Sequence, residues 1–381
     1  MTPRTIAILT TGRQDWGILR STALAVAAHP DLRLELLVGG MHLSRRHGHT
    51  VDAIRAAGLE PAAELAWLDD DGDPPADAQA AAALAAVGEW LRAHPVDALV
   101  LVGDRFETAA AALAATVTRT PLVHLHGGEQ TLGAMDDALR HAITKQAHLH
   151  LVSNDEHRRR VLALGEDPGA VHVVGAPGLD NAIRGDLPDR EALEARLGLE
   201  FGSPLVVVTV HPATLDADPA AVADAVADAM DLVPATYVIT LPNADPGGDR
   251  VRARMSAAAL RPGRVAVDAL GEAGYWGLMR VADAMLGNSS SALVEGPAVD
   301  LPAVDVGDRQ AGRHHEANIL HAAVEPSAVA AALREALDPA TRRRIRAGHP
   351  ALVDGRVGAR IADIIAAWRP SIPPRKPGIP A

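Results

Sequence analysis

Short apolar runs alternate with longer Ala-rich stretches along the whole chain. The runs are rich in Val, Leu and Ile, as in Ala98–Val102 and Leu205–Val210. Similar runs occur at Thr5–Leu9, Leu34–Val38, Leu122–Leu125, His148–Val152, Tyr237–Leu241 and Ala284–Leu286. Strands separated by helices predict βαβ units and parallel sheets, and strands that are apolar throughout predict helices on both sheet faces. The predicted fold class is therefore α/β.

The pattern restarts after a polar segment near the middle of the chain. Arg184–Asp189 places Gly and Pro inside a charged stretch, which is typical of an interdomain linker. We predict two doubly wound, Rossmann-like domains, residues 1–183 and 184–356, with a helix in 357–381 packing back on the first. Two such sheets facing each other form a central cleft at the C-terminal edges of their strands, where ligands bind. Polar residues just after strands are therefore the candidates for function.

Composition narrows the functional classes. The chain has 381 residues, of which 48% are hydrophobic, so it can bury a large core. Its net charge of −12 argues against nucleic-acid and anionic-membrane partners, and the absence of Cys excludes disulfides and thiolate chemistry. Met1–Thr10 resembles no signal peptide, and the Ala-rich run Ala78–Val87 is too short to span a bilayer. We expect a cytoplasmic protein.

The turns after Thr5–Leu9 and Ala98–Val102 each have two interpretations. Gly12 and Arg13 suit the approach of an anionic ligand, while Asp15 beside them suits a simple helix cap. Asp104 follows Ala98–Val102 after one glycine and is either a general base at the cleft or the cap of the next helix. Spacing alone leaves both alternatives open.

The densest polar cluster follows the run Leu122–Leu125. His124 and His126 lie two residues apart, on one face of a strand end, and Gly127, Gly128 and Glu129 follow. A zinc site is weakly indicated, because no third ligand has a fixed spacing. Further along lie the charged residues Asp136, Asp137, Arg140, His141 and Lys145, in a stretch that we expect to begin a helix at the Asp pair. A ligand site and a solvated capping pair both fit, and the double glycine favours the ligand site.

The second half of the chain carries small polar groups and arginines after its strands. His211 ends a strand, and Gly287–Ser291 is expected to open a helix that carries Glu295 one turn on. Consecutive serines at a helix start suit a phosphate, and Glu295 suits a ribose diol. Arg309 and Arg313 flank a glycine-bearing loop that suits a diphosphate. Together the two halves predict a nucleotide-sugar enzyme.

The motifs resemble the hydrolysing UDP-N-acetylglucosamine 2-epimerases of the sialic-acid and legionaminic-acid pathways. The likeness runs from about Ile6 to Asn318. It is carried by GRQDWG at 12–17, GMHLS at 40–44, GDRFE at 103–107, HGGEQTLGAMDDALRHAITK at 126–145, VGAPGLD at 174–180, HPAT at 211–214, LPNADPGG at 241–248, GNSSSALVEGP at 287–297 and RQAGR at 309–313. In the non-hydrolysing branch, the loop that corresponds to GRQDWG typically has a lysine, and an HRxEN-type motif stands where this chain reads HPAT. The hydrolysing branch fits better.

The resemblance implies the GT-B fold and a mechanism without a metal or redox cofactor. UDP would be eliminated from a UDP-N-acetylhexosamine to give a 2-acetamidoglucal, and water would then add to form an N-acetylmannosamine-type sugar. The implied catalytic residues are Asp104, His126, Glu129, Asp136 and His211. The implied substrate-binding residues are Arg13, Asp15, His42, Arg140, Asn243, Ser289, Ser290, Glu295, Arg309 and Arg313. A homodimer or homotetramer is also implied.

The chain departs from the family at one catalytic position. The family motif has a glutamate where this chain has His126, so either His126 or Glu129 takes the acid/base role. The alternatives left open are a product that keeps UDP, a UDP-2,4-diacetamido substrate, a role in specialised metabolism, a GT-B glycosyltransferase and an inactive nucleotide-sugar sensor.

Overall fold

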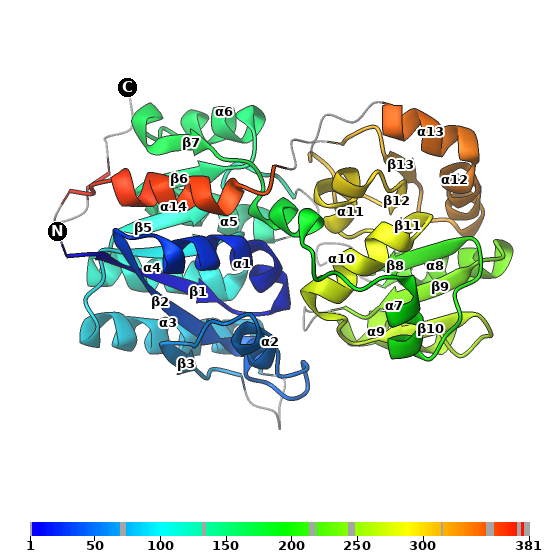
Figure 1. The fold of residues 1–381 in the computed structure, drawn as a ribbon, viewed down its shortest axis with the longest axis horizontal. Coiled ribbons are helices and arrows are strands. Elements are labelled where there is room, and N and C mark those ends of the chain that lie inside the picture. Colours follow the sequence, from blue (N-terminus) through cyan, green and yellow to red (C-terminus); the bar gives the residue numbers. More distant parts are fainter. Residues whose placement is uncertain are drawn as a thin grey trace. The chain divides into compact units, whose positions relative to one another are not determined.

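The chain forms two compact units (Figure 1). The computed structural model describes residues 2–68, 74–131, 135–212, 218, 220–242, 248–313, 315–347, 354–371 and 375–376. The first unit comprises Met1–Glu129, Asp136–Asp180 and Asp354–Ala381, and the second comprises Gln130–Met135 and Asn181–Val353. Each unit has its own parallel β-sheet, which confirms the predicted α/β class.

The first unit is built on a seven-stranded sheet with the strand order β3-β2-β1-β4-β5-β6-β7. Its strands are β1 (Arg4–Thr10), β2 (Leu32–Gly39), β3 (Ala63–Leu65), β4 (Ala98–Val102), β5 (Leu122–Leu125), β6 (Leu149–Val152) and β7 (Val171–Val173). β1 pairs in parallel with both β2 and β4. The chain builds the sheet outward in one direction from β1 to β3 and in the other from β4 to β7, so the strand order reverses between β1 and β4.

Helices cover both faces of this sheet. They are α1 (Arg13–Ala28), α2 (Val51–Ala56), α3 (Ala76–Ala93), α4 (Phe106–Thr118), α5 (Asp136–Gln146), α6 (Asp155–Ala163) and α14 (Val357–Ala367), with 3-10 turns η1 (Gly40–His42), η2 (Pro168–Ala170) and η3 (Pro177–Ile183). Ile6 and Ile8 of β1 pack in one core with α1, α2 and α14, whereas Ala7 and Leu9 pack in another with α3 and α4. Successive strand residues therefore face opposite helical layers, which explains why the strands are apolar throughout.

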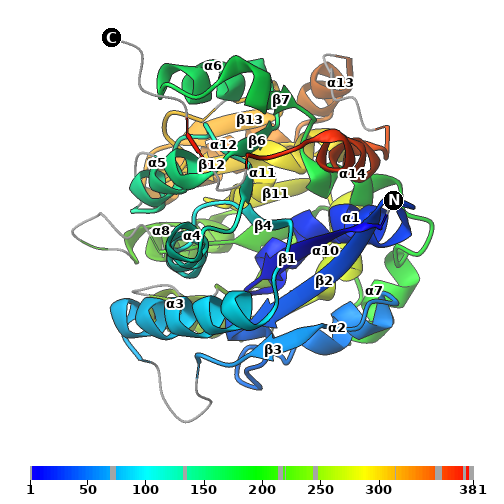
Figure 2. The same cartoon turned by 90° about the vertical axis from the view of Figure 1, so that its left-hand side faces the viewer.

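The last helix, α14, packs against α1 (Figure 2). Gly358 permits the close approach, because a Cβ at this position would lie 2.5 Å from the backbone of Ser21. The Asp180 carboxylate accepts hydrogen bonds from the backbone N–H groups of Val357 at 3.1 Å and Gly358 at 2.8 Å. These contacts hold the start of α14 in the first unit.

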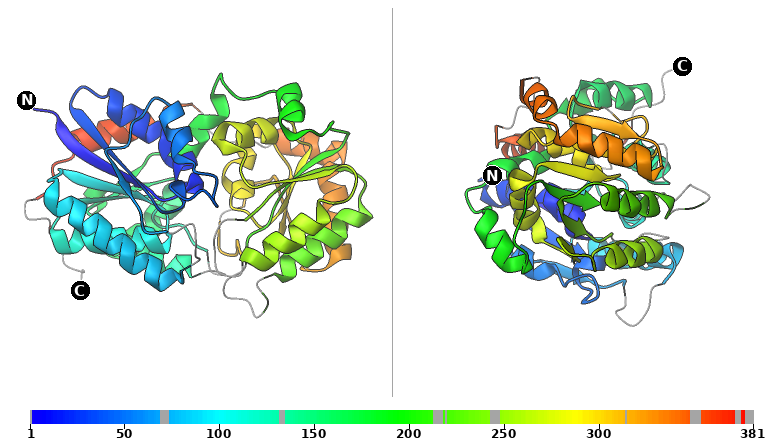
Figure 3. Two further views of the ribbon diagram at one scale, coloured as in Figure 1. Left: turned by 90° about the horizontal axis from the view of Figure 1, so that it is seen from below. Right: turned by 90° about the vertical axis from the view of Figure 1, so that its right-hand side faces the viewer.

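The second unit contains a six-stranded parallel sheet with the order β10-β9-β8-β11-β12-β13 (Figure 3). Its strands are β8 (Leu205–Thr209), β9 (Thr236–Thr240), β10 (Arg264–Val267), β11 (Ala284–Gly287), β12 (Ala303–Val306) and β13 (Ile319–Ala322). Its helices are α7 (Arg190–Leu197), α8 (Ala221–Leu232), α9 (Gly248–Ala258), α10 (Gly271–Val281), α11 (Ser291–Val294), α12 (Pro326–Leu337) and α13 (Pro339–Ala347), with the 3-10 turn η4 (Gly296–Val299). Here the strand order reverses between β8 and β11. In the part of the chain that the structure describes, no helix is long and apolar enough to cross a membrane.

Candidate active site

The candidate residues lie where the strand order of each sheet reverses. In an open parallel sheet, the crevice at such a reversal lies outside the carboxyl ends of the strands and is the usual place for a ligand. Thr11–Asp15 and Asp104 follow the two strands at this point in the first unit, β1 and β4. His211 and Asn288 follow the corresponding strands in the second unit, β8 and β11. The two halves of the predicted site therefore occupy equivalent places in their sheets.

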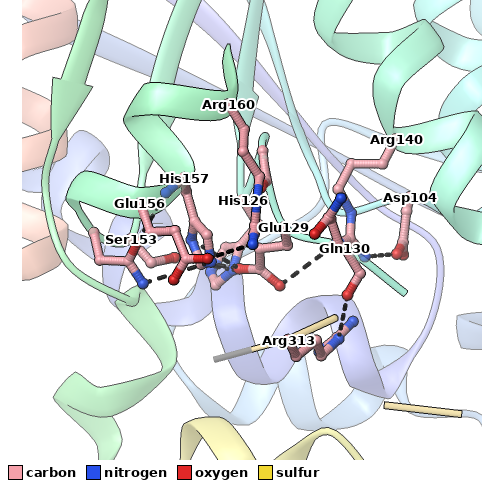
Figure 4. A network of polar contacts seen from close by, with 12 residues as sticks. Asp104, His126, Glu129, Gln130, Arg140, Ser153, Glu156, His157, Arg160 and Arg313 are labelled. Atoms are coloured by element: carbon pink, nitrogen blue, oxygen red, sulfur yellow. Dashed lines mark hydrogen bonds and ion pairs between the residues drawn. The ribbon is translucent and has the colours of Figure 1, made fainter. Parts of the chain in front are cut away.

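Asp104 forms an ion pair with Arg140 instead of capping a helix (Figure 4). Gly103, with φ of 75°, turns the chain at the end of β4, and the residue at the cap position of α4 is Arg105. Arg140 projects from α5 and is 2% exposed. Its Nη1 also lies 3.5 Å from Oε2 of Glu129, so one buried guanidinium joins two predicted catalytic carboxylates. This arrangement contradicts the capping alternative for Asp104.

His126 and Glu129 form a second pair in the loop after β5. Nδ1 of His126 lies 2.5 Å from Oε1 of Glu129, and both side chains are less than a tenth exposed. His126 has φ of 63°, in the left-handed region that non-glycine residues rarely adopt. Gly128 follows with φ of 79°, and a Cβ there would lie 2.3 Å from the carbonyl oxygen of His157. The loop is thus packed tightly against α6, and it turns the two side chains toward each other.

Residues after β6 and on α6 complete this cluster. The hydroxyl of Ser153 lies 3.3 Å from Oε1 of Glu129 and 3.4 Å from Nδ1 of His126. Arg160 donates a hydrogen bond to the Gly128 carbonyl at 3.2 Å. Burial lowers the pKa of His157 to about 4, so this ring is neutral at pH 7. The imidazole of His126 and the carboxylate of Glu129 are therefore in direct contact, and the charged groups around them include Arg140, Arg160 and the Glu156 carboxylate that pairs with Arg160 (Figure 4).

His124 and His126 have different partners. Nε2 of His124 donates to the Gly103 carbonyl at 2.8 Å, and its Nδ1 lies 3.1 Å from the hydroxyl of Thr144. Burial lowers the pKa of His124 to about 3, which keeps the ring neutral. His126 lies beyond the end of β5 with a left-handed backbone, so the regular alternation of the strand does not extend to it. Among the described residues, no group of three or more His, Asp or Glu side chains is placed to hold a metal ion.

Asp15 binds the turn that precedes it. Its Oδ2 accepts hydrogen bonds from the backbone N–H of Thr11 at 2.9 Å and from the Thr11 hydroxyl at 2.5 Å. Burial raises the pKa of Asp15 to about 6, although the nearby Arg105 opposes the shift. Arg105 in turn binds the buried Glu107 with two nitrogens, at 3.1 and 3.2 Å. Arg13, the first residue of α1, is partly exposed beside this buried cluster.

His42 is fully buried and bonded through both ring nitrogens. Nε2 lies 2.8 Å from the Thr10 hydroxyl, and Nδ1 lies 2.7 Å from the Thr50 hydroxyl. Burial lowers the pKa of His42 to about 3, so the ring is neutral. Its contacts join the end of β1 to the loop before α2, so in this conformation His42 stabilises the turn rather than presenting an exposed atom.

Asp136 begins α5, as predicted from the Asp pair. It is partly exposed, and it lies one helical turn before the buried Arg140. The next residue, Asp137, lies 3.5 Å from the His141 ring across one turn of the helix. Asp136 therefore lies on the same helix as the arginine that binds Asp104.

In the second unit, Asn288 joins the ends of β8 and β11. Its side chain accepts a hydrogen bond from the His211 backbone N–H at 2.8 Å and donates to the His211 carbonyl at 2.9 Å. Gly287, with φ of 142°, allows the approach, because a Cβ there would lie 1.9 Å from the Thr209 carbonyl oxygen. These two hydrogen bonds fix the backbone of His211 at the point where the strand order of the sheet reverses.

The serine segment opens a helix of one turn. α11 spans Ser291–Val294, and Glu295 is its C-terminal cap residue, one turn after Ser291, whose carbonyl accepts a hydrogen bond from the Glu295 N–H at 2.9 Å. Gly296 and Pro297 end the helix at this point. The hydroxyls of Ser289 and Ser291 lie 3.1 Å apart, and Ser290 is partly exposed. A helix of one turn adds little dipole, so the hydroxyls and the loop backbone are the groups that this segment can offer an anion.

The loop after β12 supplies the two predicted arginines. Arg309 donates to the Asn288 carbonyl at 3.2 Å, and Gln310 donates to the same carbonyl at 2.7 Å. Arg313 donates from Nε to the Gln130 carbonyl at 3.0 Å and from Nη2 to the Thr131 hydroxyl at 2.7 Å (Figure 4). Arg309 is therefore joined to the serine loop, whereas Arg313 contacts the segment that follows Glu129. The predicted residue Asn243 lies outside the described residues.

Several residues in these clusters had no role assigned in the sequence analysis, although four of them lie in its motifs. They are Arg105, Glu107, Ser153, His157, Arg160, Asn288 and Gln310. Ser153 and Asn288 directly follow strands, which is the signal by which the other candidates were found. The remaining five lie on helices or loop interiors, where a single sequence gives no sign of which neighbour a side chain contacts.

The chain is similar in sequence to known proteins over most of its length. The sequence profile described as UDP-N-acetylglucosamine 2-epimerase matches residues 24–366. Polysialic acid biosynthesis protein P7 of Escherichia coli is 30% identical over 336 residues, which cover 85% of this chain and 84% of that protein. The UDP-N,N'-diacetylbacillosamine 2-epimerase (hydrolyzing) of Legionella pneumophila is 31% identical over 348 residues, which cover 88% of this chain and 89% of that protein.

The fold is also found among solved structures. The UDP-GlcNAc 2-epimerase of Neisseria meningitidis bound to UDP-GlcNAc matches with a TM-score of 0.81 and 13% identity, over 96% of this chain and 100% of that one. This likeness and the two doubly wound units confirm the predicted GT-B fold. On the profile match and the two relatives, the chain belongs to the UDP-N-acetylglucosamine 2-epimerase family.

Proposed function

We propose that this chain is a hydrolysing UDP-N-acetylhexosamine 2-epimerase that releases UDP and an N-acetylmannosamine-type sugar. The observation that carries the proposal is the largely buried cluster of Asp104, Arg140, Glu129 and His126 at the carboxyl ends of β4 and β5. A relative of 31% identity is described as a hydrolyzing 2-epimerase, which supports the hydrolysing branch.

The chemistry requires an acid/base group near the sugar and an anion site for the leaving group. The C2–H of an N-acetyl sugar is a very weak acid, so its removal must accompany departure of UDP from C1. The C2–H electrons form the C1=C2 bond of a 2-acetamidoglucal, and the C1–O electrons leave on the diphosphate. Water then adds to C1 while a proton returns to C2 from the opposite face. Two proton-transfer groups are needed, and we assign them to the Asp104, His126, Glu129 and Asp136 set.

We assign the nucleotide to the loops of the second unit. Ser289, Ser290 and Arg309 would donate to the diphosphate, and fixed donors of this kind stabilise the charge that develops on the leaving group. Arg13 and Arg313 are further proposed diphosphate contacts, and His211 is proposed beside the sugar. Glu295 would accept hydrogen bonds from the ribose. Replacing Glu295 with Gln should weaken UDP binding measured by calorimetry, and an unchanged affinity would count against the ribose assignment.

A direct assay tests the reaction. Incubation with UDP-GlcNAc in heavy water should release UDP, seen by phosphorus NMR, and should place deuterium at C2 of the free sugar. A UDP-linked product labelled at C2 would instead identify a non-hydrolysing epimerase. Release of UDP without C2 deuterium would identify a hydrolase or a glycosyltransferase, and binding without any turnover would identify a sensor.

A UDP-2,4-diacetamido sugar is the second candidate substrate. It is favoured by the 31% identical Legionella relative, which is described as acting on UDP-N,N'-diacetylbacillosamine. The ratio of kcat/KM for the two sugars decides between them, because a site built for a 4-acetamido group loses hydrogen bonds when the group is a hydroxyl. We also propose a homodimer or homotetramer, which light scattering during gel filtration tests directly.

A further inference from the structure

His126 and Glu129 are arranged as a histidine–carboxylate pair. The 2.5 Å contact joins Nδ1 of His126 to Oε1 of Glu129 (Figure 4). The other oxygen of this carboxylate, Oε2, lies 3.5 Å from Nη1 of Arg140. Both oxygens of Glu129 therefore have cationic or proton-bearing neighbours, and the carboxylate cannot rotate without losing one of them.

The contact determines which nitrogen of the ring carries the proton. An ionised carboxylate only accepts hydrogen bonds, so the proton of a neutral His126 lies on Nδ1 and points to Glu129. Nε2 then presents a lone pair. This atom is buried and has no hydrogen-bond partner among the described residues. A buried polar atom without a partner is uncommon in proteins, and a catalytic role is one of the explanations for it.

The backbone gives independent support. His126 adopts φ of 63°, which costs a non-glycine residue on the order of 1 kcal/mol. Such conformations persist where the surrounding structure enforces them, and they gather at functional sites. Here the strain turns the imidazole away from the strand and onto Glu129.

Charged and polar groups from other elements surround the pair. Arg140 approaches from α5, and His157 and Arg160 approach from α6, where Nδ1 of His157 lies 4.0 Å from Oε1 of Glu129. Arg160 forms an ion pair with Glu156 of the same helix, so its charge is balanced. The hydroxyl of Ser153 faces both members from the end of β6. His157 is neutral because burial lowers its pKa to about 4, so it adds no charge next to His126.

We propose that Glu129 is a positioning residue that holds His126 with its proton on Nδ1, so that Nε2 serves as the base for the C2 proton. The inference rests on the proposed function. In the elimination step a bond forms between Nε2 and the C2 proton, the C2–H bond breaks, its electrons form C1=C2, and UDP departs with the C1–O electrons. Glu129 balances the positive charge of the imidazolium, and the proton returns to solvent before the next turnover.

Nitrogen NMR of the whole chain, labelled with ¹⁵N-histidine, tests the tautomer without any need for turnover. The signals that disappear in His126→Gln identify this ring among the 17 histidines. Wild-type protein should show the Nδ1–H form, and Glu129→Gln should shift the ring toward the Nε2–H form, because the new amide can donate to Nδ1. An Nε2–H form in the wild type, or no change in Glu129→Gln, overturns the proposal.

The pH dependence of kcat tests the catalytic consequence. The limb of the kcat–pH profile that reports the base should move to lower pH in Glu129→Gln, because removing the anion beside the imidazole disfavours its charged form. The same limb should be absent in His126→Gln. A large loss of kcat with an unmoved limb means that Glu129 is merely structural, which overturns the inference. Absence of turnover in the wild type instead refutes the proposed function, and the NMR result still decides the tautomer.

A second histidine–carboxylate pair of the first unit serves as a matched control for Glu129→Gln. His150 and Glu166 form another buried pair, with Nε2 3.0 Å from Oε2, outside the candidate site. Glu166→Gln should therefore lower the stability of the first unit and leave the pH limb of kcat where it is in the wild type. A moved limb in this variant would show that the shift reports general loosening, and it would overturn the assignment to Glu129.

Discussion

Replacing Gly128 with Ala should destabilise the first unit and disrupt the pair beside it. At φ of 79° the new side chain costs about 1–2 kcal/mol in backbone strain. Its Cβ would also lie 2.3 Å from the carbonyl oxygen of His157, which belongs to α6 and cannot move by itself. Overpacking of this kind adds about 1–3 kcal/mol, so the free energy of unfolding should fall by roughly 2–5 kcal/mol.

Gly58→Ala is the matched control for this variant. Gly58 has φ of 84°, and a Cβ there would have no atom within 4 Å, so it carries the strain without the collision. Thermal unfolding followed by calorimetry should show the larger loss for Gly128→Ala, at about 2–4 °C of Tm per kcal/mol. Because α6 must retreat, kcat should also fall in Gly128→Ala and not in Gly58→Ala. Equal Tm losses in the two variants would refute the reasoning.

Three further results are expected. Asp104→Asn should lower kcat by at least about a hundredfold with little change in UDP affinity, as is usual for loss of an acid/base group, and a wild-type rate would remove Asp104 from that role. The raised pKa of Asp15, about 6, means that the folded state holds this proton more tightly than the unfolded state; stability should therefore fall as the pH rises from about 4 to 6, and urea titrations should show the fall absent in Asp15→Asn. Burial raises the pKa of Glu166, but hydrogen bonds from a histidine and from two lysines, one of them Lys376, outweigh it and lower the pKa to about 2. Lys376→Ala should therefore destabilise the first unit above about pH 4.5 and progressively less toward pH 2, whereas the exposed Arg375→Ala should have no effect at either end.

The central strands could be predicted closely because they carry an uninterrupted signal. The sequence placed Ala98–Val102 and Leu122–Leu125 with the bounds that β4 and β5 have in the structure. These strands are buried on both faces, so every residue in them is apolar or enclosed. The edge strands β3 and β7 are three residues long and partly exposed, so they leave no comparable pattern.

The start and the end of α11 leave a signal in the local sequence. The serines precede and open the helix, and Glu295 follows one turn on as its cap residue. Gly296 and Pro297 directly follow Glu295, and this dipeptide ends the helix.

The pairing of side chains could not be predicted from the sequence. Asp104 and Arg140 come from the end of β4 and from α5, and their contact depends on which face of α5 packs against the sheet. A cap at the start of α4 was equally consistent with the spacing of Asp104. The contact between His126 and Glu129 depends on a left-handed backbone at His126, where a strand-like alternation predicted a side chain beside His124. Tertiary packing decides both outcomes.

The left-handed residues explain why the polar groups gather at the strand ends. Gly103, Gly128, Gly287 and Gly307 have positive φ at or just after the strands of the two sheets, so the backbone leaves these strands in a conformation that other residues rarely adopt. Glycine adopts this conformation without steric cost, so these turns present the next side chains without destabilising the fold. His126 adopts the same backbone conformation with a side chain attached. Since a glycine at this position would be less strained, folding alone does not explain the histidine, and the contact of its ring with Glu129 is the interaction gained in return.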